Sequence, residues 1–141
     1  MAKQFWWTQA IALAKLQAAA AAIDAGTAAV INIYSGTVPA NADAALSGNT
    51  LLAQLVCSPT FFSSYSDTGT AARGNIAAIA SDTSADASGT ATFFRVLTQN
   101  AGTVCCQGTT DTTNADLILN TVSITAGSTV AITSGTIDEL E

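Results

Sequence analysis

The spacing of the hydrophobic positions changes near residue 26. Residues 1–24 contain no glycine or proline and are rich in alanine, leucine, glutamine and lysine, all of which favour helices. Their apolar side chains recur at helical spacing on one stripe, with Leu16 beside it: Trp6, Ala10, Leu13, Ala20 and Ile23. The pattern predicts an amphipathic helix over residues 1–26, ended by Gly26.

A signal peptide is the competing interpretation of this segment, because Lys3 precedes an apolar stretch. Gln9, Lys15 and Gln17 interrupt that stretch, and the apolar run is too short to span a membrane. We therefore favour a helix that packs on its own domain or on a neighbouring subunit.

From residue 27 onward, the apolar residues gather in short runs separated by Gly, Ser, Asn, Asp and Pro. These runs have the length of β-strands: 30–34, 51–57, 61–62, 74–80, 90–97, 104–107, 116–120, 121–124 and 129–137. The polar stretches 63–73 and 81–89 are predicted to be exposed loops. Since no helical pattern alternates with the strands, we predict a mainly β fold, in which an antiparallel, jelly-roll-like β-sandwich over residues 27–141 follows the amino-terminal helix.

Residues 90–97 form the strongest predicted strand. Because successive side chains of a strand point to opposite faces, we expect these residues to face the sandwich core: Phe93, Leu97, Leu117 and Leu119. Phe94 and Val96 are then expected on the opposite face. Arg95 shares the Phe93 face, so if it is buried its guanidinium needs a carboxylate or backbone carbonyls.

The composition affects how such a fold is stabilised. The 141 residues include 29 alanines and 21 threonines, and only 6% are aromatic. A core rich in alanine contributes less free energy than one of leucine or phenylalanine, because the contribution scales with buried apolar area. We therefore expect a closed homo-oligomer, a trimer, whose interface includes Trp6, Trp7, Leu13 and Phe94.

Trp6 and Trp7 are adjacent, so on a helix their side chains diverge by about 100°. A helix anchored on a partner would bury both, whereas a helix packed on its own domain would bury one and leave the other half exposed. The sequence leaves both arrangements open.

The chemistry that the sequence offers is sparse. The net charge of −6 disfavours direct binding to nucleic acid or to an anionic membrane. The absence of histidine removes Ser-His-Asp and Cys-His catalysis and His-ligated metals. Cys57, Cys105 and Cys106 are interpreted as small apolar fillers in a reducing cytoplasm. Asp82 and Asp86 lack the spacing of a calcium loop. We expect no enzyme activity, no cofactor and no metal site.

Three segments resemble motifs of a family of small bacteriophage virion proteins. Residues 33–40 (IYSGTVPA), followed by 48–53 (GNTLLA), are similar to an I-Y-S-G-T-x-P motif with a later G-x-L-L. Residues 89–95 (GTATFFR) are similar to G-T-A-x-W/F-F-R, and residues 115–130 (ADLILNTVSITAGSTV) to A-D-L-x-L-N-x-x-S-I-x-A-G. Where many relatives have a glycine-rich stretch before the second motif, this chain is rich in Ser and Asp.

The resemblance implies a non-enzymatic structural subunit, assembled into the virion in the host cytoplasm. It favours a capsid cement or decoration protein that binds the major capsid protein or other virion proteins and stabilises the head shell. The alternative is a binding module of the neck, tail or fibre, for which Phe61, Phe62 and Tyr65 are the candidate contact residues. The resemblance brings no catalytic, cofactor-binding or metal-binding residue to this chain.

Overall fold

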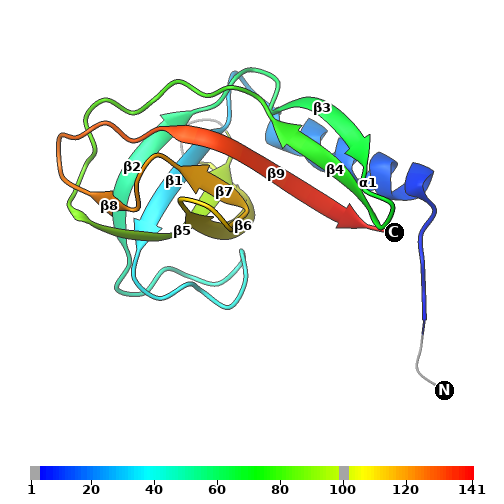
Figure 1. Cartoon of the computed structure of the whole chain (residues 1–141), viewed down its shortest axis with the longest axis horizontal. Coiled ribbons are helices and arrows are strands. Elements are labelled where there is room, and N and C mark those ends of the chain that lie inside the picture. The colour runs from blue at the N-terminus through cyan, green and yellow to red at the C-terminus, as the bar shows by residue number, and fades with distance from the viewer. Residues whose placement is uncertain (1–3, 99–101) are drawn as a thin grey trace.

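The structure is a computed structural model that describes residues 4–98 and 102–141. The described residues form one helix and nine strands, which confirms the predicted mainly β fold with an amino-terminal helix (Figure 1). The helix is α1 (Gln9–Ile23), and the strands are β1 (Val30–Ser35), β2 (Thr50–Val56), β3 (Phe62–Asp67), β4 (Ala71–Ile76), β5 (Gly89–Leu97), β6 (Val104–Asp111), β7 (Leu117–Leu119), β8 (Ser123–Ile124) and β9 (Ile132–Leu140).

The strands pair into a single curled sheet with the order β2-β1-β5-β6-β7-β9-β4-β3, and β8 pairs with the start of β5 (Figure 1). Neighbouring strands are antiparallel except for β6 and β7, which run parallel. The long strand β9 joins the two parts of the sheet, since its first half pairs with β7 and its second half with β4. The strand pairing shows a curled sheet, and it does not confirm the predicted jelly-roll-like sandwich.

The helix begins at Gln9 and not among the first residues, because Thr8 caps it. The backbone of Thr8 is extended (φ −75°, ψ 155°), and its hydroxyl accepts a hydrogen bond from the Ile11 N–H (3.4 Å). The predicted stripe is partly confirmed, because Ala20 and Ile23 are buried. It is rotated from the buried face, since Ala10 is exposed and Leu13 is only half-buried. The residues that are buried on α1 are Ala12, Leu16, Ala20 and Ile23.

α1 shares the hydrophobic core of the sheet. It packs against β4, β9, β3 and β6, and one cluster of buried residues includes Leu16 and Ile23 together with Phe61 and Leu117. The change in composition at Gly26 is therefore not accompanied by a break in packing. Within the described ranges, no helix is long and apolar enough to cross a membrane.

β5 is buried on both of its faces. Phe94 and Val96 lie in the main core with Leu117 and Leu119, so the predicted orientation, with Phe93 and Leu97 facing that core, is wrong. Phe93 is nevertheless completely buried, and its ring stacks on Tyr34 with 5.2 Å between the centroids. Residues 36–49 lie over this outer face, since the carbonyls of Pro39 and Ala44 accept hydrogen bonds from Gln107 and Arg95 on it.

A row of polar side chains fastens this loop to the sheet. The row crosses four paired strands and consists of Gln54, Asn32, Arg95 and Gln107. Gln54 donates to Asn32 (2.8 Å), and Arg95 donates to Gln107 (3.0 Å). Arg95 also donates to the Ala44 carbonyl (2.6 Å), and Gln107 donates to the Pro39 carbonyl (2.9 Å). The sequence predicts that a buried Arg95 needs either a carboxylate or backbone carbonyls. Arg95 is buried, and it bonds to backbone carbonyls.

The predicted loop at 63–73 is also wrong, because these residues form most of a hairpin between β3 and β4. Gly69 closes the turn with φ +85°, and its N–H donates to the Asp67 carboxylate (2.6 Å). Only Phe62 of β3 is buried, so the strand has no alternation of apolar residues by which the sequence could reveal it.

Candidate interaction site: an aromatic arm and a cavity in the sheet

Residues 4–8 form an extended segment before α1, which we call the arm. Figure 1 shows it leading away from the rest of the molecule. It carries Phe5, Trp6 and Trp7, whose exposed fractions are 73%, 72% and 42%. Aromatic side chains are enriched in protein interfaces, and adjacent exposed ones mark a binding surface. The arm is therefore well suited to contact another molecule.

The two tryptophans of the arm have different surroundings. The Trp7 ring meets Phe5 edge to face at 4.8 Å, and the Lys15 ammonium lies 5.0 Å from the centroid of Trp7. Lys15 also forms an ion pair with Glu139 at the end of β9. Among the described residues, no ring or cation contact involves Trp6. Its indole is thus the more available of the two.

The four residues predicted for an interface lie in different environments. Trp6 and Trp7 are on the exposed arm, and Leu13 is half-buried against the core. Phe94 is only 2% exposed, so it offers no open surface to a partner. Phe94 does line a cavity in the sheet.

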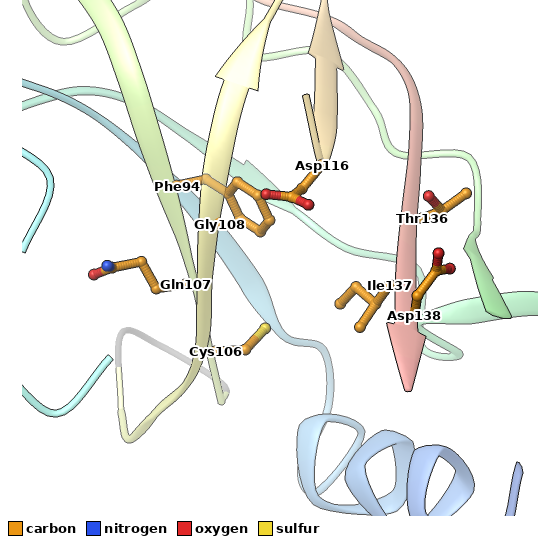
Figure 2. A pocket seen from close by; sticks show the side chains of 8 residues that line it. All are labelled: Phe94, Cys106, Gln107, Gly108, Asp116, Thr136, Ile137 and Asp138. Atoms are coloured by element: carbon orange, nitrogen blue, oxygen red, sulfur yellow. The ribbon is translucent and has the colours of Figure 1, made fainter. Parts of the chain in front are cut away.

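The cavity lies where the sheet splits between β6 and β9 (Figure 2). The short strand β7 bridges these two strands at one end, and beyond it the described parts of β6 and β9 have no strand between them. The volume of the cavity is about 220 Å³. Its lining combines apolar and polar residues: Phe94, Cys106, Gln107, Gly108, Asp116, Thr136, Ile137 and Asp138.

Gly108 allows the Phe94 ring to form one wall of the cavity. A Cβ atom on Gly108 would lie 2.6 Å from Phe94 Cε1 and 3.0 Å from Asp116 Oδ2, which is too close for any other residue without a shift. Figure 2 shows the ring and the Asp116 carboxylate side by side at this point. A glycine inside a strand often marks such a close approach, so Gly108 is the sequence signal that could have indicated the cavity.

Asp116 organises the polar side of the cavity. Its Oδ2 accepts hydrogen bonds from the backbone N–H and the hydroxyl of Thr109, both at 2.9 Å. Its carbonyl accepts from the Thr136 N–H at 3.2 Å. In the part of the chain that the structure describes, no hydrogen bond reaches Asp116 Oδ1. This oxygen is available to a donor that enters the cavity.

Two ionisable groups of the lining, Asp138 and Cys106, have shifted pKa values and differ in their charge at neutral pH. Asp138 accepts two hydrogen bonds from Arg73, both at 2.7 Å, and this pairing lowers the pKa of its carboxyl. Burial, with a smaller effect of Cys105, raises the pKa of the Cys106 thiol to about 12. The rim therefore carries a carboxylate at neutral pH, whereas Cys106 is protonated and is not an activated nucleophile.

Cys57 and Asp82, two other candidates from the sequence, contribute to the packing and bonding of the fold. Cys57 is a buried free thiol whose pKa burial raises to about 12, which suits a small apolar filler. The Asp82 carboxylate accepts from the N–H groups of Gln54 (3.2 Å) and Ser84 (2.9 Å), and so holds the 81–87 loop along the edge of β2. Residues 4–98 and 102–141 contain no group of three or more side chains that could hold a metal ion.

No protein-family model, curated protein or solved structure matches this chain. The likeness to phage virion proteins accordingly stays a prediction from its motifs.

Proposed function

We propose that the chain is a non-enzymatic structural subunit of a bacteriophage virion. In this proposal it is a cement or decoration protein that self-associates, as a trimer, and binds the major capsid protein or other virion proteins at the head. The two parts of the curled sheet, β2-β1-β5-β6 and β9-β4-β3, would then correspond to the layers of a sandwich.

The observation that carries the proposal is that the three motif segments form one connected unit. Residues 33–35 pair with β5, which holds the second motif, and the start of β5 pairs with β8 in the third motif. The Thr92 hydroxyl donates to the carbonyl of Gly36 (2.8 Å), which has φ +92°. Asn49 donates to the carbonyls of Ser35 (3.1 Å) and Thr37 (2.8 Å). The motif residues bind one another, as expected of a signature that specifies a fold.

The alternative, a fibre-associated or tail-associated binding module, has weaker support. It relied on three aromatic residues near the β3–β4 hairpin. Phe61 and Phe62 are buried in the core, and only Tyr65 reaches the surface, with 36% of its area exposed. The larger exposed aromatic surface is on the arm, which suits attachment between subunits better than recognition of a receptor.

Immunogold electron microscopy of purified particles of the encoding phage tests this proposal. We expect gold particles over the head, and we expect particles that lack the protein to lose DNA at a lower temperature than the wild type. Labelling confined to the neck or tail would favour the alternative. Particles that contain none of the protein would overturn both.

A further inference from the structure

We propose that Trp6 on the arm of one copy of the chain docks in the cavity between β6 and β9 of a second copy. This inference deepens the proposed function, because it identifies the two surfaces through which the subunit would self-associate. It rests on the self-association in that proposal and not on its place in the virion.

The cavity fits an indole ring in size and in chemistry. Its volume is about 220 Å³, and a cavity of roughly 150 Å³ is enough to hold benzene. Phe94, Cys106 and Ile137 supply apolar contacts for the ring. Asp116 Oδ1 supplies an acceptor for the indole N–H, a donor that needs a partner when it is buried. Trp6 is 72% exposed in the single chain, so its burial would remove a large apolar surface from water.

The backbone beside the cavity fits an extended segment. The N–H groups of Thr109 on β6 and Thr136 on β9 both point to Asp116, and hence away from β5 and β4. Backbone groups alternate in direction along an antiparallel pair, so Gln107 and Asp138 also turn their N–H and C=O groups toward the cavity. An extended peptide can pair with such edges. The arm is extended, and residues 4–7 belong to no strand of the sheet.

The charge distribution favours a second copy as the occupant. All ten acidic residues follow residue 23, whereas Lys3 and Lys15, half of the four basic residues, precede it. The beginning of the chain is therefore positive and the body strongly negative. Asp116 places a carboxylate at the cavity itself, while the neighbouring Asp138 is paired with Arg73. Residues 4–8 carry no charge, but Lys3 directly precedes them in the sequence, so each copy joins a positive amino-terminal segment to a negatively charged body. Opposite charges of this kind steer association.

Such a contact joins two different surfaces, so it is a head-to-tail interface. Head-to-tail contacts form a ring when the rotation between copies closes. The proposed trimer is one such ring, and it would place three arms in three cavities.

Sedimentation velocity of the purified full-length chain tests this inference. We expect a concentration-dependent oligomer, and we expect Trp6→Ala to raise the dissociation constant at least tenfold while the circular dichroism spectrum stays unchanged. Val56→Ala is the matched control, because Val56 is an apolar residue that is 58% exposed. It lies on the edge strand β2, which does not line the cavity. This control should sediment like the wild type.

Two cavity variants test the receiving surface. Ile137→Trp fills the cavity from β9, and Asp116→Asn keeps the shape but can present an amide N–H in place of the free acceptor oxygen. Both should weaken association at least tenfold. Asp116→Asn keeps the test informative if Ile137→Trp disturbs the packing beneath it.

A mixing experiment then separates arm from cavity. Trp6→Ala retains a working cavity and Ile137→Trp retains a working arm, so each variant alone should be monomeric. Their mixture should form a 1:1 dimer that does not grow further, because it contains one functional arm and one functional cavity.

Three results would overturn the inference: a wild-type chain that stays monomeric at every concentration, an oligomer that Trp6→Ala leaves unchanged, or folded variants whose mixture gives no dimer. An oligomer that persists without Trp6 would reject this docking and leave the proposed self-association intact. If a monomeric Trp6→Ala variant still labels the heads, attachment does not require self-association, and the virion role stays intact.

Discussion

The arm and α1 are consecutive in the chain and both are rich in apolar residues, yet they have opposite surroundings. Leu16 and Ile23 of α1 lie in the core that the sheet surrounds, while Phe5 and Trp6 of the arm are mostly exposed. The difference arises at Thr8, whose extended backbone and capping hydroxyl end the helix there. One threonine therefore separates a segment that stabilises the fold from a segment that is free to bind. The two segments should respond differently to substitution and deletion.

The largest expected effect is from deletion of residues 1–26. This removes the face of α1 that covers β4, β9 and β6, and it exposes apolar residues of the sheet to water. We expect loss of the cooperative thermal transition measured by circular dichroism. Deletion of residues 2–7 alone is the matched control and should keep that transition. If the shorter chain without residues 1–26 still melts cooperatively, the helix is a separable unit, as the change in composition at Gly26 suggests.

The next effect is from single truncations on the two sides of Thr8. Leu16→Ala should lower the free energy of unfolding by about 2–5 kcal/mol, the usual cost of emptying a buried leucine site. Trp6→Ala should change it by less than about 0.5 kcal/mol, because an exposed side chain has few contacts to lose. Urea denaturation of dilute, monomeric protein measures both. Equal losses would mean that the arm packs on the body.

The same contrast explains what the sequence could predict. β1 and β2 have apolar runs that end at Ser, and β5 begins at Gly89. The structure confirms these three strands within a residue or two. α1 was harder to delimit, because alanine is abundant both on its buried face and on its exposed face. Helical spacing alone placed Leu13 on the stripe and Leu16 beside it, whereas in the structure Leu16 is buried and Leu13 only half-buried.

The orientation of β5 and the position of the cavity depend on distant contacts. Alternation correctly separates Phe93 from Phe94, but it does not say which face meets the core when both are apolar. The covering loop at 36–49, fastened by Arg95 and Gln107, decides that both faces are buried. The cavity likewise combines residues from β5, β6 and β9, and it forms because the short strand β7 bridges β6 and β9 at one end only.

A smaller effect is expected at Lys15, where α1, the arm and β9 meet. Lys15 pairs with Glu139 and lies over the Trp7 ring, but its side chain is 40% exposed. Lys15→Gln should therefore cost at most about 1 kcal/mol, as is usual for exposed ion pairs. In a Trp6→Phe background, acrylamide should quench Trp7 fluorescence more strongly after the change. Unchanged quenching would show that Lys15 does not hold Trp7 against the helix.

The smallest effect is a pH dependence at the rim of the cavity. Arg73 lowers the pKa of Asp138 below its ordinary value of 3.8, so the ionised carboxylate is favoured in the folded protein. A lowered folded pKa stabilises the fold above the unfolded value, and this stabilisation is lost as the pH falls through 3.8 toward the lower folded pKa.

Burial and Asp67 raise the pKa of Glu141, so its effect on stability has the opposite pH dependence and partly masks the change at Asp138. The comparison is therefore best made in a Glu141→Gln background, with urea midpoints measured from pH 7 to pH 3 for chains with Asp138 and with Asp138→Asn. The chain with Asp138 should lose more stability on acidification, and the difference should shrink in high salt because the pair is partly exposed. Parallel curves for the two chains would mean that the Arg73 pair contributes nothing to folding and serves only to fix the charge at the rim.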